Sequence, residues 1–393
     1  MFLTPVMSSG SKIISTILKH DTKATSYKIA LLRAINDVVL SFPDLRNRKA
    51  DVAVPLRLLA QFWVAYYWPF VKPSEPILQG QRATLNGQLR NDMSFRPQLE
   101  KLRREWESIV GGTSSPSDGF FLMNELRVPR KYLAYSKALR QVYQAALTAI
   151  SKAIEMPVRY AGFGEWEVFN KPKKYAELST QVVAIPGTQL ADKCLVIQAD
   201  LWQTFGEMSL WIEALCIHEW CLFTEKVQQE NHTKVHRGFI YQLLTDRPDN
   251  RRPLNWERNH VDVLLMEGTE FVCPWTQKHI SYGIRYDLDH LLPVSLYPIN
   301  ELWNLVPADP NFNSHIKRDR LPSQAKLQQA QPSLELAYRN YSKSGSLSLA
   351  LKEDVAVRFS TVFGDTASFP GVLSTAVVDL INIFAESRNL ARF

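Results

Sequence analysis

The sequence predicts an α+β protein that is mostly α-helical, with one small strand–strand–helix domain late in the chain and helical regions on both sides of it. Apolar residues recur at helical spacing in three segments of residues 1–156. Short β-branched runs follow Pro157 and return between Tyr286 and Val306. The composition is that of an ordinary globular protein, with 46% apolar and 22% charged residues. Because 393 residues exceed the usual size of a single core, two or three domains are expected.

The first expected region is a helical N-terminal domain over residues 1–156. Three segments with apolar residues at helical spacing are predicted to be helices, namely 27–42, 98–110 and 132–154. Proline or glycine follows each of them, which ends a helix. The stretch GGTSSPSDG, residues 111–119, is predicted to be a loop.

Residues 157–260 are expected to form a mixed α/β connecting region. The β-branched runs at 182–185 and 195–197 are typical of short strands. Helical spacing returns over residues 200–229, and the following residues are rich in loop-forming and basic side chains.

The last two expected regions are the strand–strand–helix domain, residues 261–330, and a helical C-terminal region, residues 331–393. Residues 334–341 and 373–384 show the helical spacing in the second of these.

Charge and cysteine usage restrict the class of protein. The net charge of +7 favours a polyanionic partner. Four cysteines are too few for a disulfide framework in a chain of this length, so a reduced, cytoplasmic protein is expected. Residues 1–12 lack the pattern of a signal peptide. The most apolar stretch, residues 52–71, contains Arg57 and two prolines, so a buried helix is expected there and no membrane partner.

The residues that indicate chemistry lie between Phe271 and Ser323. Asp289-His290 sits in a short β-like run that Pro293 interrupts. Asn304 comes 15 residues after Asp289 and precedes the second β-like piece, Leu305-Val306. Asp309-Pro310 then supplies a helix N-cap and a proline at the first helical position. The predicted order is strand, loop, strand, helix.

Helical angles predict which side chains of the last helix share a face. At about 100° per residue, Asn313, Lys317 and Arg320 fall on one stripe, while His315 lies about 200° from Asn313. Asn313 and Asp289 offer the oxygen ligands that Mg²⁺ prefers. Lys317 and Arg320 are expected to face the phosphates of a substrate.

His290 suits the role of a base, because an imidazole with a pKa of about 6.5 is mostly neutral near pH 7 and can take a proton from water. Strict strand alternation puts Asp289 and His290 on opposite faces. Both can serve one phosphate only if the strand bends or ends there, which Pro293 makes plausible.

The segment 271–323 resembles the HNH, or ββα-metal, nuclease motif. The resemblance implies that His290 is the general base and that Asp289 and Asn313 are metal ligands. It implies that Asn304 is the central Asn, which fixes the loop that orients the histidine. The third letter of the motif is Asn here in place of His, an exchange that the family tolerates.

Two features depart from many HNH proteins. Cys273 is the only cysteine of the segment, so a four-thiolate zinc knuckle is excluded and no structural zinc is expected. Asn313 and Lys317 are four residues apart, where many HNH helices have three. The four-residue form loosely resembles a subset found in bacterial restriction and phage-defence proteins.

The resulting prediction is a metal-dependent HNH endonuclease that uses Mg²⁺ or Mn²⁺ to hydrolyse phosphodiester bonds of DNA, with RNA the less favoured substrate. The expected setting is the nuclease effector of a restriction or antiphage system, with other subunits of such a system as possible partners. The alternative is a non-enzymatic nucleic-acid-binding or regulatory protein that retains an HNH fold.

Three other patterns have simpler interpretations. Cys216, His218, Glu219 and Cys221 approach a helical HExxH metal motif, but position 222 is Leu, so a buried helix is favoured. The basic pieces 171–174 and 247–252 fit either a DNA path or ordinary surface, and ordinary surface is favoured.

Overall fold

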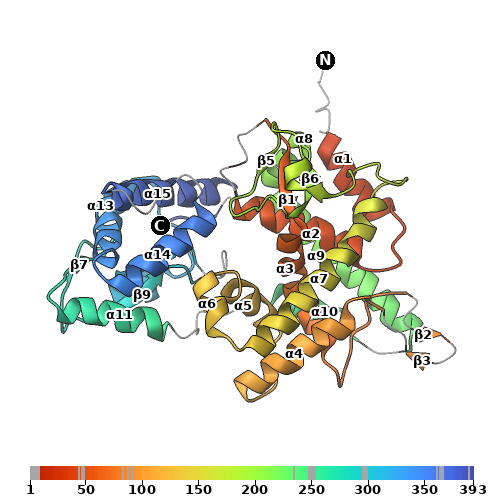
Figure 1. The fold of residues 1–393 in the computed structure, drawn as a ribbon, viewed down its shortest axis with the longest axis horizontal. Coiled ribbons are helices and arrows are strands. Elements are labelled where there is room, and N and C mark those ends of the chain that lie inside the picture. Colours follow the sequence, from red (N-terminus) through yellow and green to blue (C-terminus); the bar gives the residue numbers. More distant parts are fainter. Residues whose placement is uncertain are drawn as a thin grey trace. The chain divides into compact units, whose positions relative to one another are not determined.

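The structure is a computed structural model, which describes residues 9–42, 45, 49–81, 84–85, 88–89, 92–232, 235–246, 254–293, 300–359, 362, 367–387 and 390–393. The chain forms two compact units (Figure 1). Unit 1 comprises Met1–Met123 and Tyr135–Arg247, and unit 2 comprises Asn124–Ala134 and Pro248–Phe393. Helices dominate both units and the sheets are small, which confirms the predicted fold class.

Helices make up most of unit 1. They are α1 (Ser9–Ser15), the π-helical η1 (Thr16–His20), α2 (Tyr27–Ser41), α3 (Leu56–Tyr67), the 3₁₀ turn η3 (Trp68–Val71), α4 (Arg96–Val110), α5 (Asp118–Glu125), which continues into unit 2, α7 (Lys137–Arg159), η4 (Tyr175–Glu177), α8 (Ala199–Glu207), α9 (Ser209–Glu230) and α10 (Arg237–Thr245). Nearly every side chain of α2 is buried, because α3, α7, α8 and α9 all pack against it. The aromatic rings of Tyr27, Trp63, Tyr67 and Phe95 pack together beside this helix.

A four-stranded sheet completes unit 1, with the order β4 (Lys173–Lys174), β6 (Lys193–Ile197), β1 (Val52–Pro55), β5 (Val183–Ala184). β1 pairs antiparallel with β6, with Val52 opposite Ile197, and parallel with β5. A separate antiparallel pair is formed by β2 (Thr84–Leu85) and β3 (Gln88–Leu89). The strands expected near residues 182–185 and 195–197 are therefore present as β5 and β6.

Three expectations for unit 1 differ from the structure. Residues 52–71 were expected to form one buried helix, but the first four form strand β1, which pairs with β5 and β6 on its two sides; the β-branched Val52 and Val54 favour this extended backbone. Helix α7 continues past Pro157 to Arg159, because a proline this close to the helix end disturbs only the last turn. The helix expected over residues 200–229 is two helices, α8 and α9, which meet at Met208.

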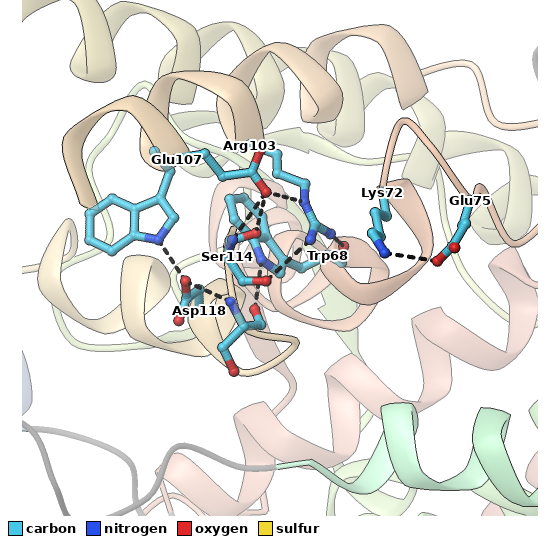
Figure 2. Close-up of polar contacts among 9 residues, drawn as sticks. Trp68, Lys72, Glu75, Arg103, Glu107, Ser114 and Asp118 are labelled. Atoms are coloured by element: carbon cyan, nitrogen blue, oxygen red, sulfur yellow. Dashed lines mark hydrogen bonds and ion pairs between the residues drawn. The ribbon is translucent and has the colours of Figure 1, made fainter. Parts of the chain in front are cut away.

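The loop predicted over residues 111–119 is held by side chains from α4 (Figure 2). Helix α4 ends at Val110 and is capped by Gly111, whose φ of 70° is left-handed. Arg103 donates to the backbone oxygens of Trp68 and Ser114 over 3.0 and 3.3 Å. Glu107 accepts from the backbone nitrogen of Ser114 over 3.1 Å. The loop borders a hollow of about 800 Å³ beside the Lys72–Glu75 ion pair.

The HExxH-like stretch lies in α9, where Cys216 and Cys221 are buried in the core. Glu219 forms an ion pair with Lys19. Within the described ranges, no group of three or more His, Cys, Asp or Glu side chains is arranged to hold a metal ion. The basic residues Lys173 and Lys174 form the exposed strand β4, and residues 247–252 lie outside the described part of the chain.

In unit 2, helices surround two short antiparallel strand pairs. Its elements are α6 (Pro129–Ala134), α11 (Asn255–Met266), β7 (Phe271–Val272), β8 (His279–Ile280), β9 (Asp287–His290), η5 (Leu302–Asn304), β10 (Leu305–Ala308), α12 (Pro310–Phe312), the π-helical η6 (Asn313–Lys317), α13 (Gln324–Tyr341), α14 (Gly345–Arg358) and α15 (Phe369–Ser387). β7 pairs with β8 and β9 with β10, both antiparallel.

The C-terminal helices share one core with these strands. On α13, the Tyr338 hydroxyl donates to the Trp303 carbonyl over 2.7 Å, and the Tyr341 hydroxyl donates to the Leu305 carbonyl over 2.8 Å. The structure therefore divides the chain differently from the four expected regions, because residues 331–393 belong to the same compact unit as β9 and β10.

Helix α15 is, among the described residues, long and apolar enough to cross a membrane by length and composition alone. Half of its apolar window, Phe369–Glu386, is buried in unit 2, where Leu373, Val377 and Ile381 join the core. A core helix of a globular unit passes the same test.

Candidate active site in unit 2

The predicted order of strand, loop, strand and helix is present in unit 2. β9 and β10 pair with His290 opposite Leu305 and Asp289 opposite Val306. The Asp309 side chain accepts from the backbone nitrogen of Asn311 over 3.0 Å and so caps the helix that begins at Pro310. Lys278 bonds the same carboxylate over 2.5 Å, and this contact lowers the pKa of Asp309.

Asn304 ties the residues after β9 to the start of β10. Its Oδ1 accepts from the Leu292 backbone nitrogen over 2.7 Å, and its Nδ2 donates to the Leu292 carbonyl over 3.1 Å. The Asn304 carbonyl also accepts from the Leu291 nitrogen over 2.8 Å. The side chain is fully buried, so these bonds replace water on both backbone groups. This contact fixes the chain immediately after His290.

Asp289 and His290 contact different parts of the unit. Asp289 is 4% exposed, and its two oxygens accept from Trp275 Nε1 and Lys317 Nζ, each over 2.8 Å. His290 is half-buried, and its Nε2 lies 2.8 Å from Oδ1 of Asn300. His290 is the last residue of β9 and pairs with Leu305.

Lys317 and Arg320 were both expected to face phosphates, but in the structure both side chains bind groups of unit 2 itself. Lys317 is 1% exposed, and its ammonium is bonded by Asp289 and by the His290 carbonyl, at 2.7 Å. The helix ends at Lys317, and Arg318, with φ at 50°, reverses the chain. Arg320 therefore falls outside the helical stripe and donates to the Ile316 carbonyl.

The unusual four-residue spacing between Asn313 and Lys317 coincides with a π-helical turn. The Arg318 nitrogen donates to the Asn313 carbonyl over 2.9 Å, a bond between residues five apart. A π turn holds one more residue than an α turn, so Asn313 and Lys317 both reach β9. His315 remains exposed, with Nδ1 3.1 Å from the Asn311 carbonyl. The turn thus leaves His315 pointing outward.

Asp287 is a site residue that the motif did not indicate. Its Oδ2 lies 3.3 Å from Nδ2 of Asn313, the residue expected to bind metal. Strand alternation was the available signal, because residues 287 and 289 share one face of β9. Two carboxylates and an amide thus stand between β9 and η6, and such oxygen donors suit a hard divalent cation.

A hollow of about 640 Å³ lies beside Asp287 and the start of the helix. Its basic lining residues are exposed, namely Lys278, His279, Arg285 and His315. Asp287 and Asp309 supply its carboxylates.

Two protein-family models match the chain, one mainly in unit 1 and one in unit 2. Residues 8–244, which lie within unit 1 apart from residues 124–134, match the family model of DUF8808, a domain of unknown function. This match spans more than half of the chain. The chain belongs to the DUF8808 family. Residues 273–323 of this DUF8808 protein also match the HNH endonuclease model, which confirms the resemblance predicted from residues 271–323.

The HNH match indicates that the DUF8808 protein has nuclease activity. Neither a curated protein nor a solved structure matches the DUF8808 chain.

Proposed function

We propose that this protein is a cytoplasmic, metal-dependent endonuclease that hydrolyses DNA, and that it acts as the nuclease effector of a bacterial restriction or antiphage system. The observation that carries the proposal is the HNH match at residues 273–323, with Asp289 and His290 on β9, Asn304 at the end of η5 and Asn313 on the helix after β10. The defence role rests only on the resemblance of the four-residue form to restriction and phage-defence proteins.

His290 is the proposed base. Because the Asn300 amide oxygen only accepts hydrogen bonds, the 2.8 Å contact assigns the imidazole proton to Nε2. Nδ1 then takes a proton from the attacking water. The water oxygen forms a bond to phosphorus, the bond from phosphorus to the 3′ oxygen breaks, and that oxygen takes a proton from solvent. The products carry a 5′ phosphate and a 3′ hydroxyl.

Asp289 and Asn313 are the proposed ligands of a Mg²⁺ or Mn²⁺ ion, and Asp287 is a third oxygen donor beside Asn313. Such an ion, when bound, supplies charge stabilisation for the leaving oxygen. An ion held by Asp289 would compete with the Lys317 ammonium, which contacts the same carboxylate and also the His290 carbonyl.

One observation favours the alternative, a binding protein without catalysis. The buried ion pair between Asp289 and Lys317 satisfies the carboxylate without any ion. Retention of the whole Asp289, His290, Asn304 and Asn313 set favours the nuclease, since binding alone has no need of it.

We expect the purified protein to nick supercoiled plasmid with added Mg²⁺ or Mn²⁺ and to lose this activity in EDTA. Oxygen ligands bind these ions weakly enough for a chelator to remove them. Gel analysis of plasmid, linear duplex, single-stranded DNA and RNA identifies the substrate. Metal analysis is expected to find no stoichiometric zinc. Binding of DNA without cleavage under all these conditions would support the non-enzymatic alternative.

Arg285, and not Arg320, is the proposed phosphate contact, because it is exposed on the hollow beside Asp287. Arg285→Ala is expected to weaken DNA binding on any sequence and to lower the slope of log affinity against log salt by about 1. Fluorescence anisotropy in a His290→Ala background measures both. Arg339→Ala removes the same charge from an exposed site on α13 and is the control. Equal effects of the two substitutions would reject this assignment.

A further inference from the structure

Helix α6 belongs to the DUF8808 match in sequence but to the nuclease unit in structure. Residues 124–134 lie inside the matched range 8–244, yet they cluster with unit 2. Two cationic side chains of α6, Arg130 and Lys131, are only 18% and 14% exposed. Charged side chains are rarely buried without partners, so their contacts show what α6 contributes to unit 2.

These contacts hold the segment that leads into η5. Lys131 Nζ donates to the Asn300 carbonyl over 3.0 Å, and Glu125 holds the same ammonium over 2.9 Å. Arg130 pairs with the fully buried Asp354 over 2.6 Å. Asp354 in turn accepts from the Leu302 backbone nitrogen over 2.8 Å. Residues 300 and 302 are thus both fixed by α6, the first directly and the second through Asp354.

Asn300 connects α6 to the proposed base, because its carbonyl contacts Lys131 and its side chain contacts His290. It is 6% exposed, and its side-chain oxygen lies 2.8 Å from Nε2 of His290. An acceptor at Nε2 selects one neutral tautomer of the ring and fixes its orientation. A catalytic group that is displaced by about 1 Å can lose on the order of 100-fold in rate, so the position of Asn300 matters for catalysis.

We propose that Lys131 and Asn300 form a positioning pair for His290, through which the DUF8808 part of the chain sets the orientation and tautomer of the nuclease base. Neither residue is a proposed metal ligand or phosphate contact. The pair acts by holding the Asn300 backbone, so that the Asn300 amide oxygen stays opposite Nε2. The proposal rests on the proposed nuclease function of His290.

Lys131→Met tests the pair, because it removes the ammonium and keeps most of the apolar stem. We expect kcat for plasmid cleavage to fall about 10- to 100-fold, with KM for DNA within about twofold of wild type. Lys131→Arg restores a donor and is expected to recover part of kcat. Lys343→Met makes the same lysine-to-methionine change at an exposed lysine of unit 2, in the turn after α13, and is expected to keep wild-type kcat.

A second readout does not depend on cleavage. Nitrogen-15 NMR of the metal-free protein, with the His290 signal assigned from His290→Gln, reports which ring nitrogen carries the proton. Wild type is expected to show the Nε2–H tautomer, and Lys131→Met and Asn300→Leu a mixture. If Lys131→Met does not fold by circular dichroism, Asn300→Leu decides the proposal by the same readouts.

If the folded variants keep wild-type kcat and the wild-type tautomer of His290, the proposed role of Lys131 and Asn300 is wrong. If wild type itself does not cleave nucleic acid, the proposed function fails, and the NMR experiment still decides whether Lys131 and Asn300 orient His290.

Discussion

His290→Ala is expected to reduce the rate of plasmid cleavage by about 10²–10⁴-fold while leaving the fold and DNA affinity unchanged. The imidazole has an ordinary pKa near neutrality, and no other histidine lies on β9 or β10, so the strands offer no second base of this kind. The side chain is only half-buried and stands at the end of β9, so its removal leaves no large cavity. Single-turnover cleavage measures the rate, anisotropy with labelled DNA measures the affinity, and circular dichroism checks the fold.

His260→Ala is the matched control for this experiment. His260 lies in the same unit, on α11, where Nδ1 is 2.8 Å from the Trp256 carbonyl. It has no contact with β9 among those described and is expected to retain full activity. Near wild-type nicking by His290→Ala would remove His290 from the mechanism and show that another group acts as the base.

The sequence predicted those parts of the site that depend on residues adjacent in the chain. Asp309-Pro310 predicts a helix start because capping depends on adjacent residues, and the structure has that cap. The β-like runs around Asp289 and Leu305 predict the two strands, and both are present. The helical N-terminal half follows from apolar spacing in the same way, with α2 and α4 within two residues of their expected bounds.

The missed contacts depend on residues far apart in the chain. Trp275 reaches Asp289 from 14 residues away, and Lys131 reaches Asn300 from 169 residues away. No periodicity in one sequence encodes such pairings. The burial of Lys317 escaped prediction because a charged residue on a short helix is usually solvated, and only its ion pair with Asp289 makes burial tolerable.

The π turn explains why helical angles gave a partly correct result. Angles of about 100° per residue assume an α-helix, and under that assumption Asn313, Lys317 and Arg320 share a face. In the structure the wider turn brings Asn313 and Lys317 to β9, but it also ends the helix at Lys317. The prediction that Arg320 faces the phosphates assumed a helix that reaches this residue, whereas the helix ends at Lys317.

Asn313→Ala is expected to reduce metal-dependent cleavage severely, whereas His315→Ala is expected to change it little. Asn313 lies opposite Asp287, with its amide Nδ2 3.3 Å from Asp287 Oδ2. A 180° rotation of the amide about its last bond turns the oxygen, the atom that binds a divalent ion, toward the same place. Loss of one oxygen ligand weakens ion binding, so raising Mg²⁺ or Mn²⁺ is expected to restore only part of the rate. His315 is exposed, and removing an exposed imidazole rarely changes stability by more than about 0.5 kcal/mol.

The two residues form a matched pair, because they are two positions apart on one turn and only one of them faces β9. Cleavage rates measured against Mn²⁺ concentration separate a binding defect from a catalytic one. A shift of the half-maximal Mn²⁺ concentration in Asn313→Ala, absent in His315→Ala, identifies Asn313 as the ligand. The reverse result, with His315→Ala inactive and Asn313→Ala active, means that the metal-bound enzyme rotates the π turn so that the histidine faces Asp289. The histidine letter of the HNH motif would then be His315.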